Sequence, residues 1–156
     1  MENIIMYVKK NFKLGFDIRA LILFGVIMIP TLIWVIVPAP NDILRNESVT
    51  KTLDMFASIS QVVMIILLCM IINKACEKTK HKWFLFGIVV SCLLYFIGWI
   101  FYYNGAINSL IILDLCITPC LAFLFYCIAK RNILAIVPAI IFMICHLIYG
   151  IVNFIV

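Results

Sequence analysis

Two side chains with acid–base chemistry lie inside apolar stretches of this chain. Asp114 lies in LIILDLCITPC, residues 110–120, and His146 lies in IIFMICHLIYG, residues 140–150. A carboxylate at the centre of a membrane-crossing helix costs roughly 2.5–3.5 kcal/mol. Such a group is therefore expected to face a cavity or a partner, where it could accept a proton or hold a cation.

The composition indicates which solvent surrounds these groups. Of the 156 residues, 67% are hydrophobic and only 12% are charged, whereas a soluble domain is about half apolar and about a quarter charged. A domain of this size cannot hide so much apolar surface in its own core, so we expect a lipid bilayer. The net charge of +5 does not indicate nucleic acid, because the basic residues lie between apolar runs.

Five apolar segments are each close to the ~20 residues that cross a bilayer as a helix. Helices satisfy all their backbone hydrogen bonds internally, which lipid requires. We therefore predict an all-α, polytopic membrane protein that forms one transmembrane domain over residues 1–156. The predicted spans are residues 20–37, 55–73, 83–103, 109–129 and 133–156, with an interfacial basic segment at 1–18 and an external loop at 38–54.

Basic residues are distributed unequally between the two sets of connections. Only Arg45 and Lys51 lie in the first loop. The others flank the first span or lie in the loops after the second and fourth spans, at Lys9, Lys10, Lys13, Arg19, Lys74, Lys78, Lys80, Lys82, Lys130 and Arg131. The positive-inside rule predicts the N-terminus inside and the C-terminus outside. Residues 1–18 form either an interfacial helix on the inner leaflet or a frayed basic tail.

With this orientation, the polar residues of the five spans converge on the outer half of the bilayer. Asp114, for example, lies about five residues, or roughly 8 Å, below the outer boundary. Asp54, Ser58 and Gln61 share one face of a helix. We expect an outward-facing cavity in which Asp114 and His146 pair. The candidate ligand-binding residues are Asp114, His146, Gln61, Thr118, Tyr95, Trp99 and Asn153.

Structural roles are the alternative for many of these residues. Aromatic residues near span ends commonly form an interfacial belt, and Gln61, Thr118 and Asn153 could simply join neighbouring helices. The seven cysteines include no C-x-x-C pair and are interpreted as small apolar residues. No nucleotide-binding, metal-binding or catalytic motif is visible. We therefore expect no enzyme, no metal, no cofactor and no nucleic-acid partner.

Two stretches carry a resemblance to other proteins. LIWVIVPAPND, residues 32–42, and AKRNILAIVPAIIFMICHLIYG, residues 129–150, resemble small five-span integral membrane proteins of Gram-positive bacteria, a group with no assigned activity. The resemblance implies a multi-pass protein of a bacterial plasma membrane. It carries over no functional residue.

Three functions compete, and the third, an intramembrane enzyme, is the least favoured because no set of catalytic groups is visible; the other two are compatible with these observations. The first is binding or transport of a small or amphipathic ligand through the outer-half cavity, with Asp114 as proton or cation acceptor and His146 as its partner. Five spans are few for a transporter, so this hypothesis implies a homodimer. The alternative is a non-catalytic accessory, regulatory or immunity-type protein that docks to another membrane protein. The first predicts a cavity of a few hundred Å³, and the second predicts a filled interior.

Overall fold

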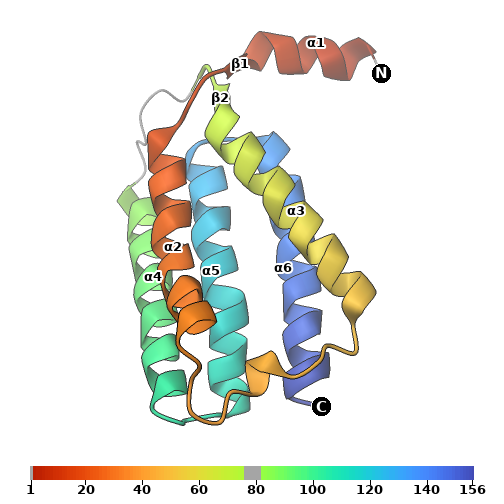
Figure 1. The fold of residues 1–156 in the computed structure, drawn as a ribbon. Coiled ribbons are helices and arrows are strands. Elements are labelled where there is room, and N and C mark those ends of the chain that lie inside the picture. The colour runs from red at the N-terminus through yellow and green to blue at the C-terminus, as the bar shows by residue number, and fades with distance from the viewer. Residues whose placement is uncertain (1, 76–81) are drawn as a thin grey trace.

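The computed structural model describes residues 2–75 and 82–156, with side chains described from Met6 onward. Cys76, Lys78 and Lys80 therefore lie outside the described residues. The described elements are α1 (Glu2–Asn11), β1 (Phe12–Leu14), α2 (Ile18–Ile36), a 3₁₀ turn (Ile43–Arg45), α3 (Lys51–Met70), β2 (Ile71–Asn73), α4 (Lys82–Tyr103), α5 (Ser109–Ala129) and α6 (Ile133–Phe154) (Figure 1).

Five of the helices, α2 to α6, are long and apolar enough to cross a membrane. The prediction of an all-helical chain with five such helices is confirmed for the described residues. The second predicted span, residues 55–73, is shifted: helix α3 begins earlier, at Lys51, and also ends earlier. Helix α3 ends at Met70, because the next three residues leave the helix and pair with β1 as strand β2.

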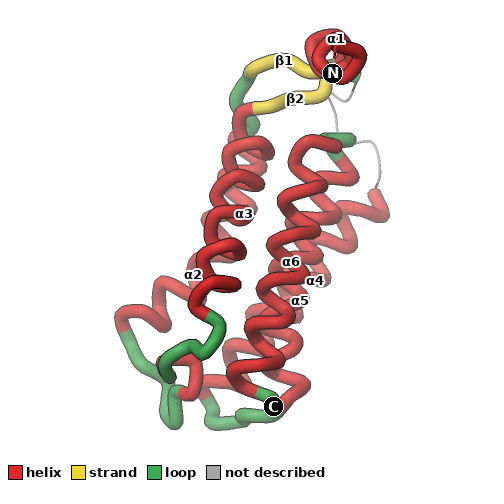
Figure 2. Tube along the Cα trace, turned by 90° about the vertical axis from the view of Figure 1, so that its right-hand side faces the viewer, coloured by secondary structure: helices red, strands yellow, loops and turns green. Residues whose placement is uncertain are grey.

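The five long helices form two layers. One layer holds α2 and α3, and the other holds α4, α5 and α6 (Figure 2). Helix α5 packs closely against both α4 and α6, and α3 packs closely against α6, whereas α2 makes much lighter contact with its neighbours. The most buried of the five is α5, so it forms the centre of the bundle.

Small residues allow the helices of the second layer to approach closely. The carboxylate of Asp114 in α5 lies directly against Gly98 of α4, and the thiol of Cys116 lies directly against Gly150 of α6. A side chain at either glycine would collide with these groups. Close approach at small residues is a usual source of helix association in membranes, where lipid removes the hydrophobic driving force.

The two ends of the bundle differ. The lysine-rich end, as we name it, holds α1, the antiparallel β1–β2 ladder and the turn from Lys130 to Asn132. The loop end holds residues 37–50, the turn between α4 and α5, and the C-terminus (Figure 1). All described basic residues except Arg45 and Lys51 lie at or beside the lysine-rich end. Each long helix therefore runs from one chemically distinct end to the other.

Candidate functional site

A cavity of about 320 Å³ lies between the two layers. Its walls come from α2 around Ile27 to Thr31, from α3 between Asp54 and Gln61, and from parts of α4, α5 and α6. These parts of α2 and α3 are the halves nearest the loop end. The structure therefore contains a cavity at the depth where the polar residues were expected to converge.

The most polar part of the cavity wall comes from two helices, α3 and α6. Four of the lining residues stand out among the described ones because their side chains are polar or titratable and share one face of α3 or α6. They are Asp54, Ser58, Gln61 and His146. The spacing of the three α3 residues predicted this stripe, and the cavity confirms that they share one face.

Aromatic rings complete the wall. His146 stacks between Phe142 and Tyr149, with ring centroids 5.2 Å and 6.0 Å away. On the opposite wall, the hydroxyls of Tyr95 and Thr31 form a 3.0 Å hydrogen bond that joins α4 to α2. The stacking and the hydrogen bond hold the rings in place, so the cavity has fixed walls on both layers.

Several polar groups of the cavity are available to a ligand. Gln61, Ser58 and His146 make no hydrogen bond to any residue that the structure describes. Asp54 accepts one hydrogen bond, of 3.2 Å, from the hydroxyl of Thr50. No lysine or arginine lines the cavity among the described residues. With a neutral histidine, the wall carries one negative charge, and it favours a positively charged or hydrogen-bond-donating group.

Asp114 does not line this cavity, contrary to the expectation from the sequence. Its carboxylate lies against Gly98 on the side of α5 that packs on α4. The side of α5 that reaches the cavity carries Leu115, Pro119 and Phe123. The expected Asp114–His146 pair is therefore absent from the cavity wall, and the carboxylate nearest to His146 there is Asp54.

Three further expected residues also lie outside the cavity wall. The hydroxyl of Thr118 donates to the backbone oxygen of Asp114 at 2.7 Å, within its own helix. Asn153 joins α6 to the loop end, because its amide accepts from Val49 N at 2.7 Å and donates to Thr50 Oγ1 at 2.7 Å. Trp99 is buried beside Tyr95, and among the described residues its indole nitrogen has no hydrogen-bond partner. Of the seven candidates, His146, Gln61 and Tyr95 line the cavity.

A cluster that the sequence analysis did not find closes the loop end. Asp42 accepts hydrogen bonds from Trp34 Nε1, at 2.9 Å and 2.8 Å, and from Tyr102 Oη, at 2.8 Å. Arg45 lies 2.8 Å from the same carboxylate and 4.9 Å from the Trp34 ring. Burial alone would raise the pKa of Asp42, but the hydrogen bonds from Trp34, Tyr102 and Arg45 hold it below its usual range. We call this cluster the Asp42 anchor.

A second cluster lies at the lysine-rich end. Asp17 caps α2 by accepting from Arg19 N at 3.1 Å. The other oxygen of its carboxylate accepts from Tyr126 Oη at 2.9 Å and lies 3.0 Å from Lys130 Nζ. Burial alone would raise the pKa of Asp17, but the Lys130 and Tyr126 hydrogen bonds and the Lys130 charge hold it below its usual range. We call this cluster the Asp17 anchor.

Both anchors had signals in the sequence. Asp17 directly precedes an apolar run, which is the usual position of a helix N-cap. Trp34 and Tyr102 lie near the ends of predicted spans, where aromatic residues commonly form an interfacial belt, although a buried ring with a polar tip usually finds a hydrogen-bond partner. Lys130 was counted only as a topology-determining charge. Each anchor joins residues far apart in the chain, so spacing along one helix could not reveal it.

The comparisons with known proteins identify no relative. No protein-family model, no curated protein and no solved structure matches the chain. Within residues 2–75 and 82–156, no group of three or more histidine, cysteine or acidic residues is placed to hold a metal ion. The class that the fold defines is therefore a multi-pass helical membrane protein.

Proposed function

We propose that this protein binds a small or amphipathic ligand whose positively charged head group enters the cavity between the two layers. Binding of this kind is the first step for a carrier and for a receptor alike. The observation that supports it is the cavity wall itself, where Asp54 lies among polar groups that have no hydrogen-bond partner in the described part of the chain. The competing accessory role predicts a filled interior, and a cavity of about 320 Å³ favours ligand binding instead.

The charge and the aromatic rings of the cavity wall together indicate which ligand head group the cavity would bind. Asp54 attracts a cation, and no lysine or arginine among the described lining residues opposes it. Tyr95 and Tyr149 line the same space, and aromatic rings can bind ammonium groups through cation–π attraction. A primary or quaternary amine satisfies both features, whereas a phosphate or carboxylate would be repelled by Asp54.

The test makes the same substitution at two aspartates, Asp54 of α3 and Asp114 of α5. In detergent micelles, we expect dodecylamine to raise the unfolding temperature of the wild-type protein, because a ligand that binds the folded state stabilises it. Asp54→Asn should abolish this shift. Asp114→Asn should keep it, because Asp114 packs against Gly98 outside the cavity. An unchanged shift in Asp54→Asn would refute the proposal.

We also propose that the protein lies in a bacterial plasma membrane with its lysine-rich end in the cytoplasm. The charge difference between the two ends supports this orientation. The test uses intact cells that express a variant of the protein without reactive cysteine, into which a single cysteine is introduced at Lys13 or at Glu47. A membrane-impermeant maleimide should label Glu47→Cys and leave Lys13→Cys unlabelled. The reverse pattern would contradict the proposed orientation.

A further inference from the structure

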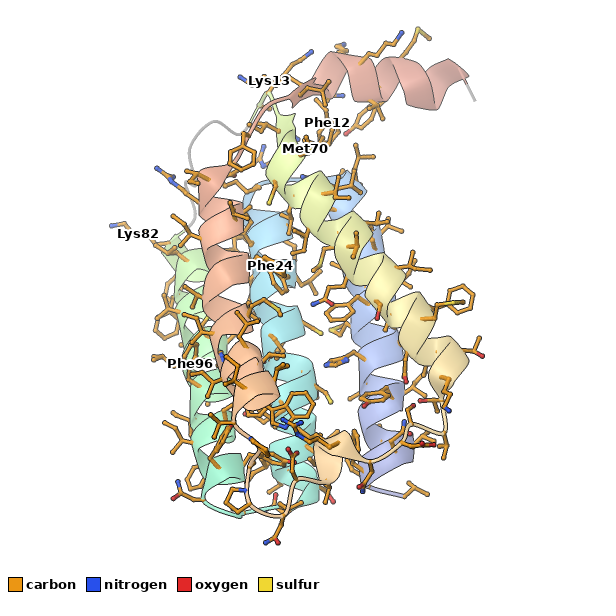
Figure 3. The ribbon with its side chains drawn as sticks, in the orientation of Figure 1. Phe12, Lys13, Phe24, Met70, Lys82 and Phe96 are labelled. Carbon is orange, nitrogen blue, oxygen red and sulfur yellow. The ribbon has the colours of Figure 1, made fainter. Side chains whose placement is uncertain are left out.

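A second, smaller cavity adjoins the first one between α2 and α3. Its volume is about 170 Å³, and it is lined by Phe24 of α2 and by Gln61, Val62, Ile65 and Ile66 of α3. Phe24, labelled in Figure 3, therefore lies on the side of α2 that faces α3. We call this space the seam groove. Apart from Gln61, every residue that lines it is apolar.

Gln61 connects the two spaces because it lines both of them. On one side of Gln61 along α3 lie the polar residues Ser58 and Asp54, toward the loop end. On the other side lie Val62 to Ile66, just past the middle of the helix and in the half nearest the lysine-rich end. The polarity therefore changes along the axis of α3, over about 10 Å from Asp54 to Gln61 and about 7 Å more to Ile66.

This order of polarity matches that of a lipid in the leaflet at the loop end. Such a lipid holds its head group at the membrane surface and points its chain toward the bilayer centre. The cavity accepts the head group near the loop end, and the seam groove continues from the middle of α3 toward the lysine-rich end, in the direction that the hydrocarbon chain would point. Val62 and Ile66 are 58% and 50% exposed at the surface of the bundle, so the groove opens to the hydrocarbon.

The α2–α3 seam is closed only near the lysine-rich end. There, Asp17 N donates to Cys69 O at 2.8 Å and Gly15 N donates to Met70 O at 3.1 Å. Beyond these bonds, no hydrogen bond joins α2 to α3 among the described residues. A hydrocarbon chain lying in this part of the seam therefore breaks no hydrogen bond between the two helices.

From these features we infer that the ligand is a membrane amphiphile with an amine head group that enters sideways between α2 and α3. Its head group occupies the cavity beside Asp54, and the first part of its hydrocarbon chain occupies the seam groove. This inference rests on the proposed function, because it names the substrate class and the entry route of the same site. A small polar amine without a chain would use the cavity alone.

Two adjacent valines provide a matched test. Val62 lines the seam groove, whereas Val63 lies beside it on α3, is 42% exposed and lines neither space. Val62→Trp fills the groove, and Val63→Trp adds the same bulk to the lipid-facing surface. Binding of dodecylamine and of ethylamine is measured by calorimetry in the same micelles, so that partition into the detergent is equal for each variant.

We expect Val62→Trp to weaken dodecylamine binding at least about tenfold, or ~1.4 kcal/mol, and to leave ethylamine binding unchanged. Val63→Trp should bind both amines as the wild type does. Ile66→Trp, which fills the same groove, repeats the test if Val62→Trp does not fold.

Three outcomes would overturn the inference or its basis. Equal dodecylamine binding in Val62→Trp and Val63→Trp would refute the seam groove as the site of the hydrocarbon chain. If Asp54→Asn lost binding in the same experiment, the proposed head-group site in the cavity would still stand. Equal weakening of both amines in Val62→Trp would also refute it, because the effect would not depend on the chain. Failure of Asp54→Asn to affect either amine would instead refute the proposed function.

Discussion

Helices α5 and α2 are held in the bundle in opposite ways. Helix α5 contacts its neighbours along its whole length, with Asp114 against Gly98 and Cys116 against Gly150. Helix α2 is anchored mainly at its two ends, by Asp17 and through Trp34 to Asp42. Between these ends it lines both the cavity and the seam groove. The comparison shows how the fold combines stability with an opening, since polar bonds at the ends of α2 supplement the lighter packing of its middle.

The largest effect is expected from breaking an end of α2. Asp17→Ala removes the helix cap, the acceptor of Tyr126 and the partner of Lys130, whose side chain is only 14% exposed. Leaving a buried charge without its partner costs about 3–5 kcal/mol. We expect a loss of this size in the free energy of unfolding, measured by denaturant titration in mixed micelles. Glu47→Ala, which removes the highly exposed pair with Lys51, should change little.

The same anchor predicts a pH dependence. The folded state holds the pKa of Asp17 below its ordinary value. Its stabilising contribution is therefore fully present above that ordinary value and is lost as the pH falls through the folded value. Unfolding should become easier in the wild type as the pH falls below about 4, the ordinary value for an aspartate. The decline should be smaller in Asp17→Asn, and equal declines would contradict the role given to this carboxylate.

A smaller effect is expected from overfilling the packed side. A Cβ at Gly98 would collide with the Asp114 carboxylate and crowd Leu115, and overpacking typically costs about 1–3 kcal/mol. We expect Gly98→Val to lower the free energy of unfolding by this amount. Gly25→Val is the matched control on α2, where an added Cβ meets nothing within 4 Å. It should change stability by less than about 0.5 kcal/mol, and equal losses at both glycines would remove the contrast between α2 and α5.

The sequence predicted the helices and one polar stripe because both depend on local periodicity. Apolar runs of spanning length identified the five helices, and the spacing of Asp54, Ser58 and Gln61 identified their common face. The depth of His146 and Tyr95 also followed from counting residues from the span ends. Each of these inferences uses information within one segment, so it did not require the arrangement of the helices.

The partners of these residues could not be predicted in the same way. Counting residues from the span ends put Asp114 and His146 at a similar depth in the membrane. The neighbour that a side chain contacts depends, however, on the rotation of α5 about its own axis. That rotation is fixed by the close contact of α5 with Gly98 and Gly150. The pairs Asp17–Lys130 and Asp42–Tyr102 likewise depend on how the chain returns to each end of the bundle. Periodicity determines the face of a helix, whereas tertiary packing determines what that face touches.

The β1–β2 ladder has a consequence for the size of the opening. It pairs Phe12–Leu14 with Ile71–Asn73, so the chain from β1 through α2 and α3 to β2 forms a ring that is fastened at one end. The far side of this ring is residues 37–50, and the Asp42–Trp34 bonds hold the first part of that stretch against α2. How far α2 and α3 can separate is thus limited by chain length, at ~3.3–3.6 Å per residue of the remaining tether. The largest separation of α2 and α3 is therefore set by the length of the covalent chain that joins them. Insertions after Arg45 would increase it, and deletions would decrease it.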